Sequence, residues 1–435
     1  MIGRQSLYGI TLILEYISTM GGHIMAQMLT GACLFAQSGG PTSVINASAY
    51  GVIKTALESP EITNVYAAEH GIVGILKGVL FDMSKEDPAE LELLLNTPSS
   101  EFGSCRYKMG DPAKDDTDYR RLLEVFKKFD IRYFFYNGGN DSMDTCNKVS
   151  DFMEKSGWEC RVIGVPKTID NDLMGTDHCP GYGSAAKYVA TSVAEVYKDS
   201  TVYDIGTITI VEAMGRHAGW LTGAAALSGL SGAAPDLIYL PEVPFDMESF
   251  LANVDAVYKA KNKCLIVISE GLSYADGTLV AESKSKDGFG HSQLGGLAYS
   301  LAEIVKAHTG AKVRGIELSL LQRCAAHLAA QTDINESFLA GMTAVKCAVA
   351  GETGKMVAFT RETVDGKYHC GVSLQPLSIC ANSEKKVPRE WINETGTFVT
   401  QEFIDYVLPL IQGENSRRLE NGLPRFAKLK KVKTT

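Results

Sequence analysis

The chain has 435 residues, of which 45% are hydrophobic and 21% charged. This composition is ordinary for a globular protein of about two or three domains. Its formal net charge of −9 argues against a general nucleic-acid binder, which needs a basic surface. Small phosphorylated substrates remain open, since a few local arginines can bind phosphate. Nowhere does the sequence hold about 18 consecutive apolar residues, so we expect no membrane span.

Cysteine and histidine spacing gives no sign of a covalent or metal framework. Ten cysteines lie between Cys33 and Cys380 without a Cys-x-x-Cys pair, and the eight histidines show no spacing typical of a metal site. We therefore expect reduced cysteines in a cytoplasmic enzyme rather than disulfides or zinc.

The two ends of the chain differ in character from the rest. Residues 1–27 contain a short apolar stretch that Glu15 interrupts, so we interpret them as an N-terminal extension rather than a signal peptide. The last residues form a basic run, which predicts a solvated tail. Its members are Lys428, Lys430, Lys431 and Lys433.

Short apolar runs alternate with longer helix-like stretches, a rhythm typical of parallel βαβ units. We predict helices from about Asn46 and over 88–96, and a surface loop over 284–290. Five of the predicted strands end in glycine-rich or polar turns. Because the ligand of an open α/β sheet lies at the carboxyl ends of its strands, we expect the site at these turns. The predicted strands are residues 32–36, 131–136, 161–165, 207–213, 264–269 and 313–318.

Two of these turns carry paired glycines. Gly39-Gly40 follows the first strand, and Gly138-Gly139 follows the second and precedes Asn140 and Asp141. Glycine lets a phosphate approach the backbone closely. Asn140 and Asp141 could hold Mg²⁺ directly or through water. A structural turn and an Asn/Asp helix cap are the alternatives.

The third strand is followed by two carboxylates. Asp170 and Asp172 are two residues apart, so in an extended segment both side chains point to the same side. One could take a proton from a substrate hydroxyl while the other places Mg²⁺ or orients the first. An Asx-turn is the alternative, but Lys167 supplies a cation where a transferred phosphate would need one.

Polar residues at the remaining turns suit a phosphorylated sugar. Glu270 ends the fifth strand and could accept hydrogen bonds from sugar hydroxyls. Arginine binds phosphate bidentately, and several arginines lie beside glycines or in polar turns. They are Arg106, Arg216, Arg314 and Arg323.

In this order, the motifs resemble those of the phosphofructokinases over most of the chain, from about Leu29 to Asp333. The resemblance implies an α/β fold of two Rossmann-like three-layer domains with a cleft between them. The phosphoryl-donor domain would be 28–180 plus about 325–395, and the fructose 6-phosphate domain 181–324 plus about 396–435. It also implies a homodimer, with a homotetramer as the alternative.

The resemblance also implies roles for single residues. Asp170 would accept the proton of the sugar 1-hydroxyl, and Gly39 and Arg106 would bind the donor. Mg²⁺ is the implied cofactor, with Asn140 and Asp172 as candidate ligands. The residues that would bind fructose 6-phosphate are Thr168, Ile169, Asp170, Met214, Gly215, Arg216, Glu270, Arg314 and Arg323.

Two positions indicate the pyrophosphate-dependent branch. ATP-using members carry glycine where this chain has Asp141 and Lys167, whereas pyrophosphate-using members carry aspartate and lysine. A carboxylate at Asp141 would repel the α-phosphate of ATP. Lys167 would stabilise the phosphate leaving group. We therefore predict reversible phosphoryl transfer from pyrophosphate to fructose 6-phosphate, a glycolytic reaction.

Three alternatives remain. The first is an ATP-dependent phosphofructokinase, the second a non-catalytic sugar-phosphate sensor, and the third a dinucleotide oxidoreductase, although the fingerprint glycines of the last are missing. The chain also departs from the family's pattern: Asn140 replaces an aspartate, Thr207 an arginine and Leu320 a histidine.

Overall fold

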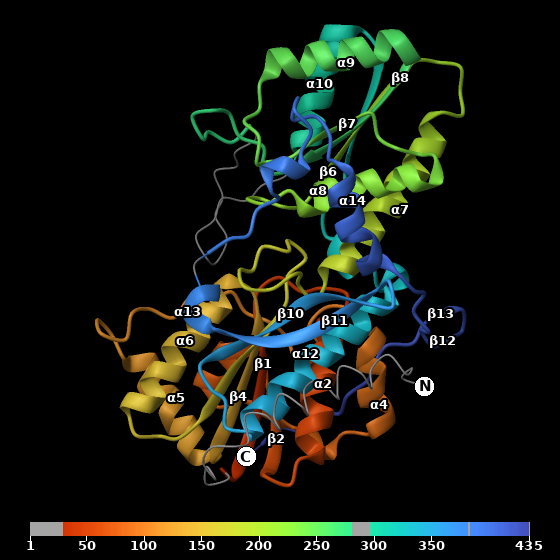
Figure 1. Ribbon diagram of the computed structural model, residues 1–435. Coiled ribbons are helices and arrows are strands. Elements are labelled where there is room, and N and C mark those ends of the chain that lie inside the picture. The colour runs from red at the N-terminus through yellow and green to blue at the C-terminus, as the bar shows by residue number, and fades with distance from the viewer. Residues whose placement is uncertain (1–28, 281–295, 382, 435) are drawn as a thin grey trace.

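The computed structural model describes residues 29–280, 296–381 and 383–434, arranged in two lobes (Figure 1). Each lobe is built around a mainly parallel sheet with helices on its faces, which confirms the predicted α/β fold. The expected N-terminal extension, residues 1–27, and the loop over 284–290 lie outside the described residues.

The first lobe contains a seven-stranded sheet with the order β11-β10-β5-β4-β1-β2-β3. Its pairs are parallel except β2–β3 and β10–β11. The chain therefore leaves this sheet after β5 and returns to it with β10. The strands are β1 Gly31–Gln37, β2 Ile62–Ala68, β3 Leu80–Asp82, β4 Ile131–Gly138, β5 Arg161–Pro166, β10 Lys355–Val364 and β11 Lys367–Pro376.

The second lobe contains a parallel four-stranded sheet with the order β7-β8-β6-β9. All six predicted strands are present in the two sheets, whereas β2, β3, β7, β10 and β11 were not predicted. The strands are β6 Thr207–Ala213, β7 Leu237–Tyr239, β8 Lys263–Ser269 and β9 Lys312–Glu317.

Helices cover both faces of the first sheet. One apolar cluster joins the sheet to α5 and α6, and another joins it to α2 and α12. The helix predicted near Asn46 begins at Ile45, and the one predicted over 88–96 is α4 followed by a 3₁₀ turn, Leu93–Asn96. The helices of this lobe are α2 Ile45–Glu58, α3 Gly71–Lys77, α4 Pro88–Glu92, α5 Thr117–Lys128, α6 Asn140–Lys155, α12 Gln331–Val349 and α13 Leu377–Cys380.

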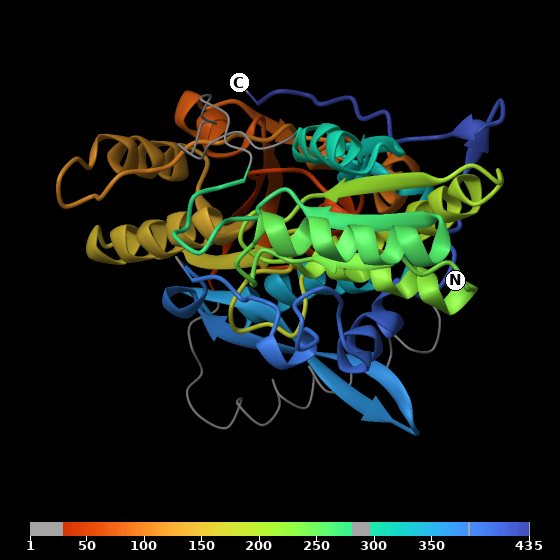
Figure 2. The ribbon, with the colours of Figure 1, turned by 90° about the horizontal axis from the view of Figure 1, so that it is seen from above.

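The helices of the second lobe pack in the same way around its sheet. Helices α9 and α10 cover one face, and α7, α8 and α14 form the largest apolar cluster on the other, toward the first lobe. The two sheets are seen from above in Figure 2. The helices are α7 Tyr182–Ser200, α8 Trp220–Ala224, α9 Met247–Lys261, α10 Leu297–Thr309, α11 Leu321–Cys324 and α14 Gln401–Val407.

The periodicity of α5 illustrates why these segments form helices. Its buried side chains, Tyr119, Leu122, Val125 and Phe126, recur at helical spacing on one face. Asp118 lies in the first turn and Lys127 in the last, as the helix dipole favours. The helix therefore buries one apolar stripe against β4 and leaves its charged face in solvent.

The C-terminal segment corrects one expectation. The basic run was predicted to be a solvated tail, but its backbone N–H groups at Lys428, Lys430 and Lys431 donate to Glu90 and Glu86. This part of the chain lies on the first lobe, not on the fructose 6-phosphate domain in which we expected residues 396–435. It follows a short hairpin of β12, Leu419–Glu420, and β13, Leu423–Pro424.

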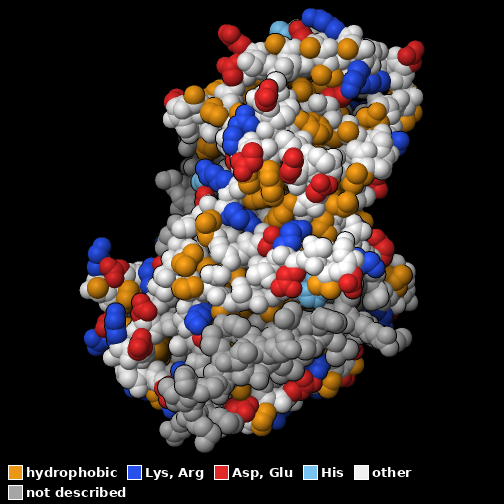
Figure 3. Space-filling view, in the orientation of Figure 1, with side chains coloured by type: hydrophobic (Ala, Val, Ile, Leu, Met, Phe, Trp, Pro, Cys, Tyr) orange, Lys and Arg blue, Asp and Glu red, His pale blue; other side chains and the backbone are white. Residues whose placement is uncertain are grey.

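Free cysteines and mixed surface charge characterise the described residues. All ten cysteines are free. On the face shown in Figure 3, acidic and basic side chains intermingle over the described atoms. Among the described helices, none has the length and apolar character needed to cross a membrane.

Candidate active site

The polar turns after β1, β4 and β5 come together because these strands are neighbours in the first sheet. Gly39 has a φ of 76°, and a Cβ there would lie 3.0 Å from Lys167 Nζ. A Cβ on Gly40 would lie 3.3 Å from an Arg323 nitrogen and 3.9 Å from an Arg106 nitrogen. Three cations from distant parts of the chain therefore face the paired glycines.

The segment from Thr168 to Asp172 forms a turn, which corrects the assumption that it is extended. Asn171 has a φ of 56°, a left-handed conformation that Asn tolerates better than most residues. Its side chain is locked, since Oδ1 accepts from the Cys179 N–H at 2.9 Å and Nδ2 donates to the Tyr406 hydroxyl at 2.8 Å. The Asp170 N–H donates to Thr168 Oγ1 at 3.1 Å.

The charged groups around this turn are buried and perturb one another. Burial raises the pKa of Asp170, against the opposing effect of Lys167 and Arg216. Burial and the nearby Asp170 raise the pKa of Asp172 to about 7. Burial lowers the pKa of Lys167 to about 8, although Asp170 counteracts it. Such shifted, mutually coupled groups in one place are typical of catalytic sites.

The residues expected to bind a sugar form a second cluster, at the carboxyl ends of β6 and β8. Gly215 has a φ of 129°, and its N–H donates to Glu270 Oε1 at 3.3 Å. Burial, followed by the effect of Asp170, raises the pKa of Glu270 to about 7. Asp170 and Arg216 both affect the pKa of the Glu270 carboxyl. This cluster therefore adjoins the turn from Thr168 to Asp172, which we call the acceptor turn because it holds Asp170, the predicted proton acceptor.

Gln322 was missed by the sequence reasoning. It is 2% exposed, and its side-chain oxygen accepts from the Met214 N–H at 3.1 Å. It therefore ties the turn at Met214 to α11, the helix that carries Arg323. Its neighbour in the sequence, Arg323, was the only signal that this segment mattered.

Arg314 is the predicted site residue that does not join these clusters. It pairs with Thr209 in the register of β9 and β6, four residues before the carboxyl end of β6 at Ala213. Its guanidinium is exposed and lies 3.9 Å from Asp199. A single copy of the chain thus holds Arg314 on the outer edge of the second sheet.

Asn140 and Asp141 are the first two residues of α6, and the N-cap position is occupied by Gly139, so neither side chain caps the helix. The helix-cap alternative for these two residues is therefore wrong. Asp141 forms an ion pair with Lys108 at 3.3 Å.

The candidate metal ligands Asn140 and Asp172 lie next to each other, one at the start of α6 and the other in the turn from Thr168 to Asp172. Asn140 Nδ2 donates to Asp172 Oδ2 at 3.1 Å, while Asn140 Oδ1 is buried and has no hydrogen-bond partner within the described parts of the chain. An amide oxygen and a carboxylate side by side are the ligand types that Mg²⁺ takes.

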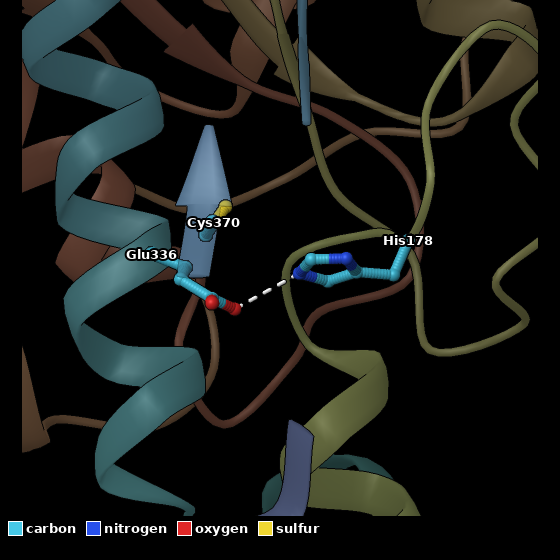
Figure 4. Close-up of side chains that lie close together, drawn as sticks. All are labelled: His178, Glu336 and Cys370. Atoms are coloured by element: carbon cyan, nitrogen blue, oxygen red, sulfur yellow. Dashed lines mark hydrogen bonds and ion pairs between the residues drawn. The ribbon is translucent and has the colours of Figure 1, made fainter. Parts of the chain in front are cut away.

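A second buried charge cluster lies near the end of the loop between β5 and α7, the loop that begins with the acceptor turn (Figure 4). His178 contacts Glu336 on α12 through Nε2 and Asp177 through Nδ1, both at 2.9 Å. Burial opposes the charge on His178, yet the two carboxylates raise its pKa to about 9. Arg361 completes the cluster by donating to both Asp177 oxygens. Figure 4 also shows Cys370 close by. Its sulfur lies within 4.8 Å of a ring nitrogen of His178 and of a carboxylate oxygen of Glu336.

The comparison with known proteins agrees with this geometry. Residues 32–348 match the Phosphofructokinase family profile. The chain is 47% identical over 401 residues to the pyrophosphate–fructose 6-phosphate 1-phosphotransferase of Halomonas elongata, covering 91% of this chain and 96% of the relative. It is 44% identical over 399 residues to the enzyme of that name from Methylococcus capsulatus, covering 91% and 95%.

A solved structure extends the match to three dimensions. The pyrophosphate-dependent phosphofructokinase from Marinobacter aquaeolei is 42% identical and superposes with a TM-score of 0.84, covering 93% of this chain and 97% of that one. With the profile covering most of the chain and these relatives matched almost end to end, the chain belongs to the phosphofructokinase family, whose enzymes generally use a divalent metal ion.

Proposed function

We propose that the chain transfers a phosphoryl group from pyrophosphate to the 1-hydroxyl of D-fructose 6-phosphate, giving fructose 1,6-bisphosphate and phosphate. The observation that carries the donor assignment is Lys167, a residue that is 4% exposed and whose ammonium lies against Gly39. A buried cation there suits an inorganic phosphate leaving group. The names of the relatives cited above support the same donor.

Asp170 is the proposed proton acceptor. As the sugar O1 attacks the terminal phosphorus of pyrophosphate, its proton passes to the Asp170 carboxylate, and the bridging P–O bond breaks to release phosphate. General-base catalysis of this kind contributes about 10²–10⁴-fold. Lys167 and Arg106 offset the negative charge on the transferred group and on the departing phosphate.

Asn140 and Asp172 would hold Mg²⁺. When bound, this ion neutralises phosphate charge and helps to align the donor with the acceptor. The buried Asn140 oxygen, which has no hydrogen-bond partner within the described residues, supports this role.

The sugar phosphate would lie between the two lobes. Thr168 and Ile169 would contact it from the acceptor turn, Met214, Gly215 and Arg216 from the turn after β6, and Glu270 would accept from its hydroxyls. Arg323 would grip the 6-phosphate. The donor domain would comprise 28–180 and about 325–395, together with 425–434, and the sugar domain 181–324 and about 396–424.

Arg314 would reach a sugar phosphate only from another copy of the chain, because its own copy holds it on the outer edge of β9. We therefore propose a homodimer as the active unit, with a homotetramer as the alternative. We also propose that the enzyme acts in the cytoplasm.

Asp141 would exclude ATP. Its carboxylate lies in the first turn of α6, just after Gly138-Gly139. The α-phosphate of a nucleotide would meet a like charge there. The ion pair with Lys108 holds this carboxylate in place.

The test is a donor comparison on wild type, Asp141→Gly and Lys167→Gly. We expect wild type to prefer pyrophosphate, Asp141→Gly to admit some ATP, and Lys167→Gly to lower kcat with pyrophosphate by about 10²-fold. Asp151→Gly, the same change at an exposed site of α6, is the control for effects on the helix. A wild type that used ATP far better than pyrophosphate would overturn the donor assignment, and an unchanged kcat in Lys167→Gly would remove Lys167 from the mechanism.

A further inference from the structure

The lysine-rich C-terminal segment is fixed on the first lobe by a regular set of contacts. We call residues 425–434 the C-terminal strap. Lys433 forms an antiparallel bridge with Phe81, and the Thr434 N–H donates to Leu80 O at 2.9 Å. The strap thus adds a short length of strand beside β3. In Figure 2 this dark-blue end of the chain runs along the first lobe.

The strap also holds an irregular loop, residues 97–106, which we call the donor loop because it ends in Arg106. Lys431 Nζ donates to the Glu101 backbone O at 2.6 Å and lies 2.8 Å from Glu101 Oε1. The Ala427 N–H donates to Thr97 Oγ1 at 2.9 Å. The loop is therefore fastened at both its beginning and its middle.

Apolar packing reinforces these bonds. Ala427 and Leu429 of the strap pack in the same cluster as Phe102 of the donor loop, which is 2% exposed. The donor loop contains neither helix nor strand, so contacts with other segments must fix its conformation.

From Glu101 the donor loop continues directly into the proposed donor site. The Phe102 N–H donates to Gln37 Oε1 at 3.3 Å. Ser104 Oγ donates to Gly39 O at 2.7 Å, and the Gly39 N–H donates to Cys105 O at 3.0 Å. Any shift of the donor loop would therefore move Gly39 and Arg106 together.

We propose that the C-terminal strap positions the phosphoryl-donor site, with Lys431 as a positioning residue that acts through Glu101 on Gly39 and Arg106. This inference rests on the proposed function, since it takes pyrophosphate as the donor. The Lys431 ammonium binds both the carbonyl and the carboxylate of one loop residue, and so fixes the backbone direction as well as the side chain.

The test measures KM for each substrate at saturating Mg²⁺ in Lys431→Met, with Lys430→Met as the matched control. Lys430 is its neighbour in the strap, but its ammonium donates to Lys85 O, away from the donor loop. We expect Lys431→Met to raise KM for pyrophosphate on the order of tenfold, as displaced binding groups do, with KM for fructose 6-phosphate within twofold of wild type. Lys430→Met should change neither constant, and Lys431→Arg should restore donor KM.

Glu101→Gln provides a second variant, which leaves the strap intact and weakens the same contact. It decides the question if thermal unfolding shows that Lys431→Met is not folded. A donor KM within twofold of wild type in the folded variants would overturn the inference, as would equal rises for both substrates, which indicate a general loss of structure.

The proposed function can fail separately. If wild type used only ATP, the pyrophosphate assignment would fall, and the same variants would be measured by KM for ATP. An unchanged KM for ATP would then overturn the role of the strap as well.

Discussion

The loop between β5 and α7 carries acidic residues at both ends, and the two ends have opposite electrostatics. At one end, burial raises the pKa of Asp170 and brings that of Asp172 to about 7. At the other, burial acts in the same direction on Asp177, but hydrogen bonds from His178 and Arg361 lower its pKa to about 2. The same residue type is thus unstable as an anion in one place and stabilised in the other.

The difference lies in which hydrogen bonds the folded chain supplies. The Asp177 carboxylate receives donors from two cationic side chains, as a structural ion pair requires. The Asp170 carboxylate is also close to two cations, Lys167 and Arg216, but burial outweighs their effect and its pKa is raised. A buried anion with incomplete compensation lowers stability, and it is suited to binding substrates or protons. This contrast supports the proposal that one end of the loop serves catalysis while the other holds the loop in place.

Replacing Asp170 should produce the largest effect on activity. In Asp170→Asn, kcat should fall by about 10²–10⁴-fold while the midpoint of thermal unfolding stays equal or rises, because a destabilised charge has been removed. Steady-state kinetics and calorimetry on the same preparation measure both. A kcat within tenfold of wild type, or a clearly lower midpoint, would contradict the catalytic assignment.

Replacing Glu336 should show the reverse pattern. Glu336→Gln leaves His178 with one carboxylate partner, so the free energy of unfolding should fall by about 3 kcal/mol or more, with kcat of the folded fraction near that of wild type. Glu58→Gln, in the exposed Lys54–Glu58 pair of α2, should cost less than about 0.5 kcal/mol. Denaturant titration compares them, and equal costs would mean that the buried cluster has no special role.

The His178 cluster should also give stability a distinctive pH dependence. The pKa of His178 is raised from its ordinary value of 6.5 to about 9, so its stabilising contribution is complete below pH 6.5 and is lost as pH rises to about 9. The difference in unfolding midpoint between wild type and His178→Gln should therefore shrink over that interval. A difference that stays constant from pH 6 to 9.5 would rule out a charged His178.

The smallest effect concerns Lys167. Its pKa of about 8 predicts that kcat/KM, which reports the free enzyme, falls above about pH 8 as the ammonium loses its proton. In Lys167→Arg the guanidinium stays charged, so this alkaline limb should move up by more than one pH unit even if the rate at its maximum is lower. If the alkaline fall in kcat/KM of Lys167→Arg stayed at the pH of wild type, that fall would belong to another group.

The sequence predicted features that lie within one continuous segment. Buried strands preceding polar segments stood out as apolar runs, and the segments Thr168–Asp172 and Met214–Arg216 stood out as candidate site residues, although the first was expected to be extended. The hairpin of β10 and β11 was missed because the apolar run of β10 stops at Phe359 and polar residues follow it. The apolar run of β2 is similarly short and follows Thr63 and Asn64.

Features that depend on juxtaposition could not be predicted in this way. His178 meets Glu336 across 158 positions, and Lys431 meets Glu101 across 330. Nothing in the local sequence distinguishes these residues from solvated charges. Asn171 was a usable signal, since Asn between two aspartates favours a left-handed turn over an extended segment.

The most direct test follows phosphorus itself. In ³¹P NMR of wild type with Mg²⁺, fructose 6-phosphate and pyrophosphate, the pyrophosphate signal should disappear while a new 1-phosphate ester and inorganic phosphate grow in equal amounts. Adding excess phosphate to fructose 1,6-bisphosphate should regenerate pyrophosphate. Hydrolysis of pyrophosphate to phosphate without ester formation, or ester formation with ATP alone, would contradict the assignment of this chain as a pyrophosphate-dependent phosphotransferase.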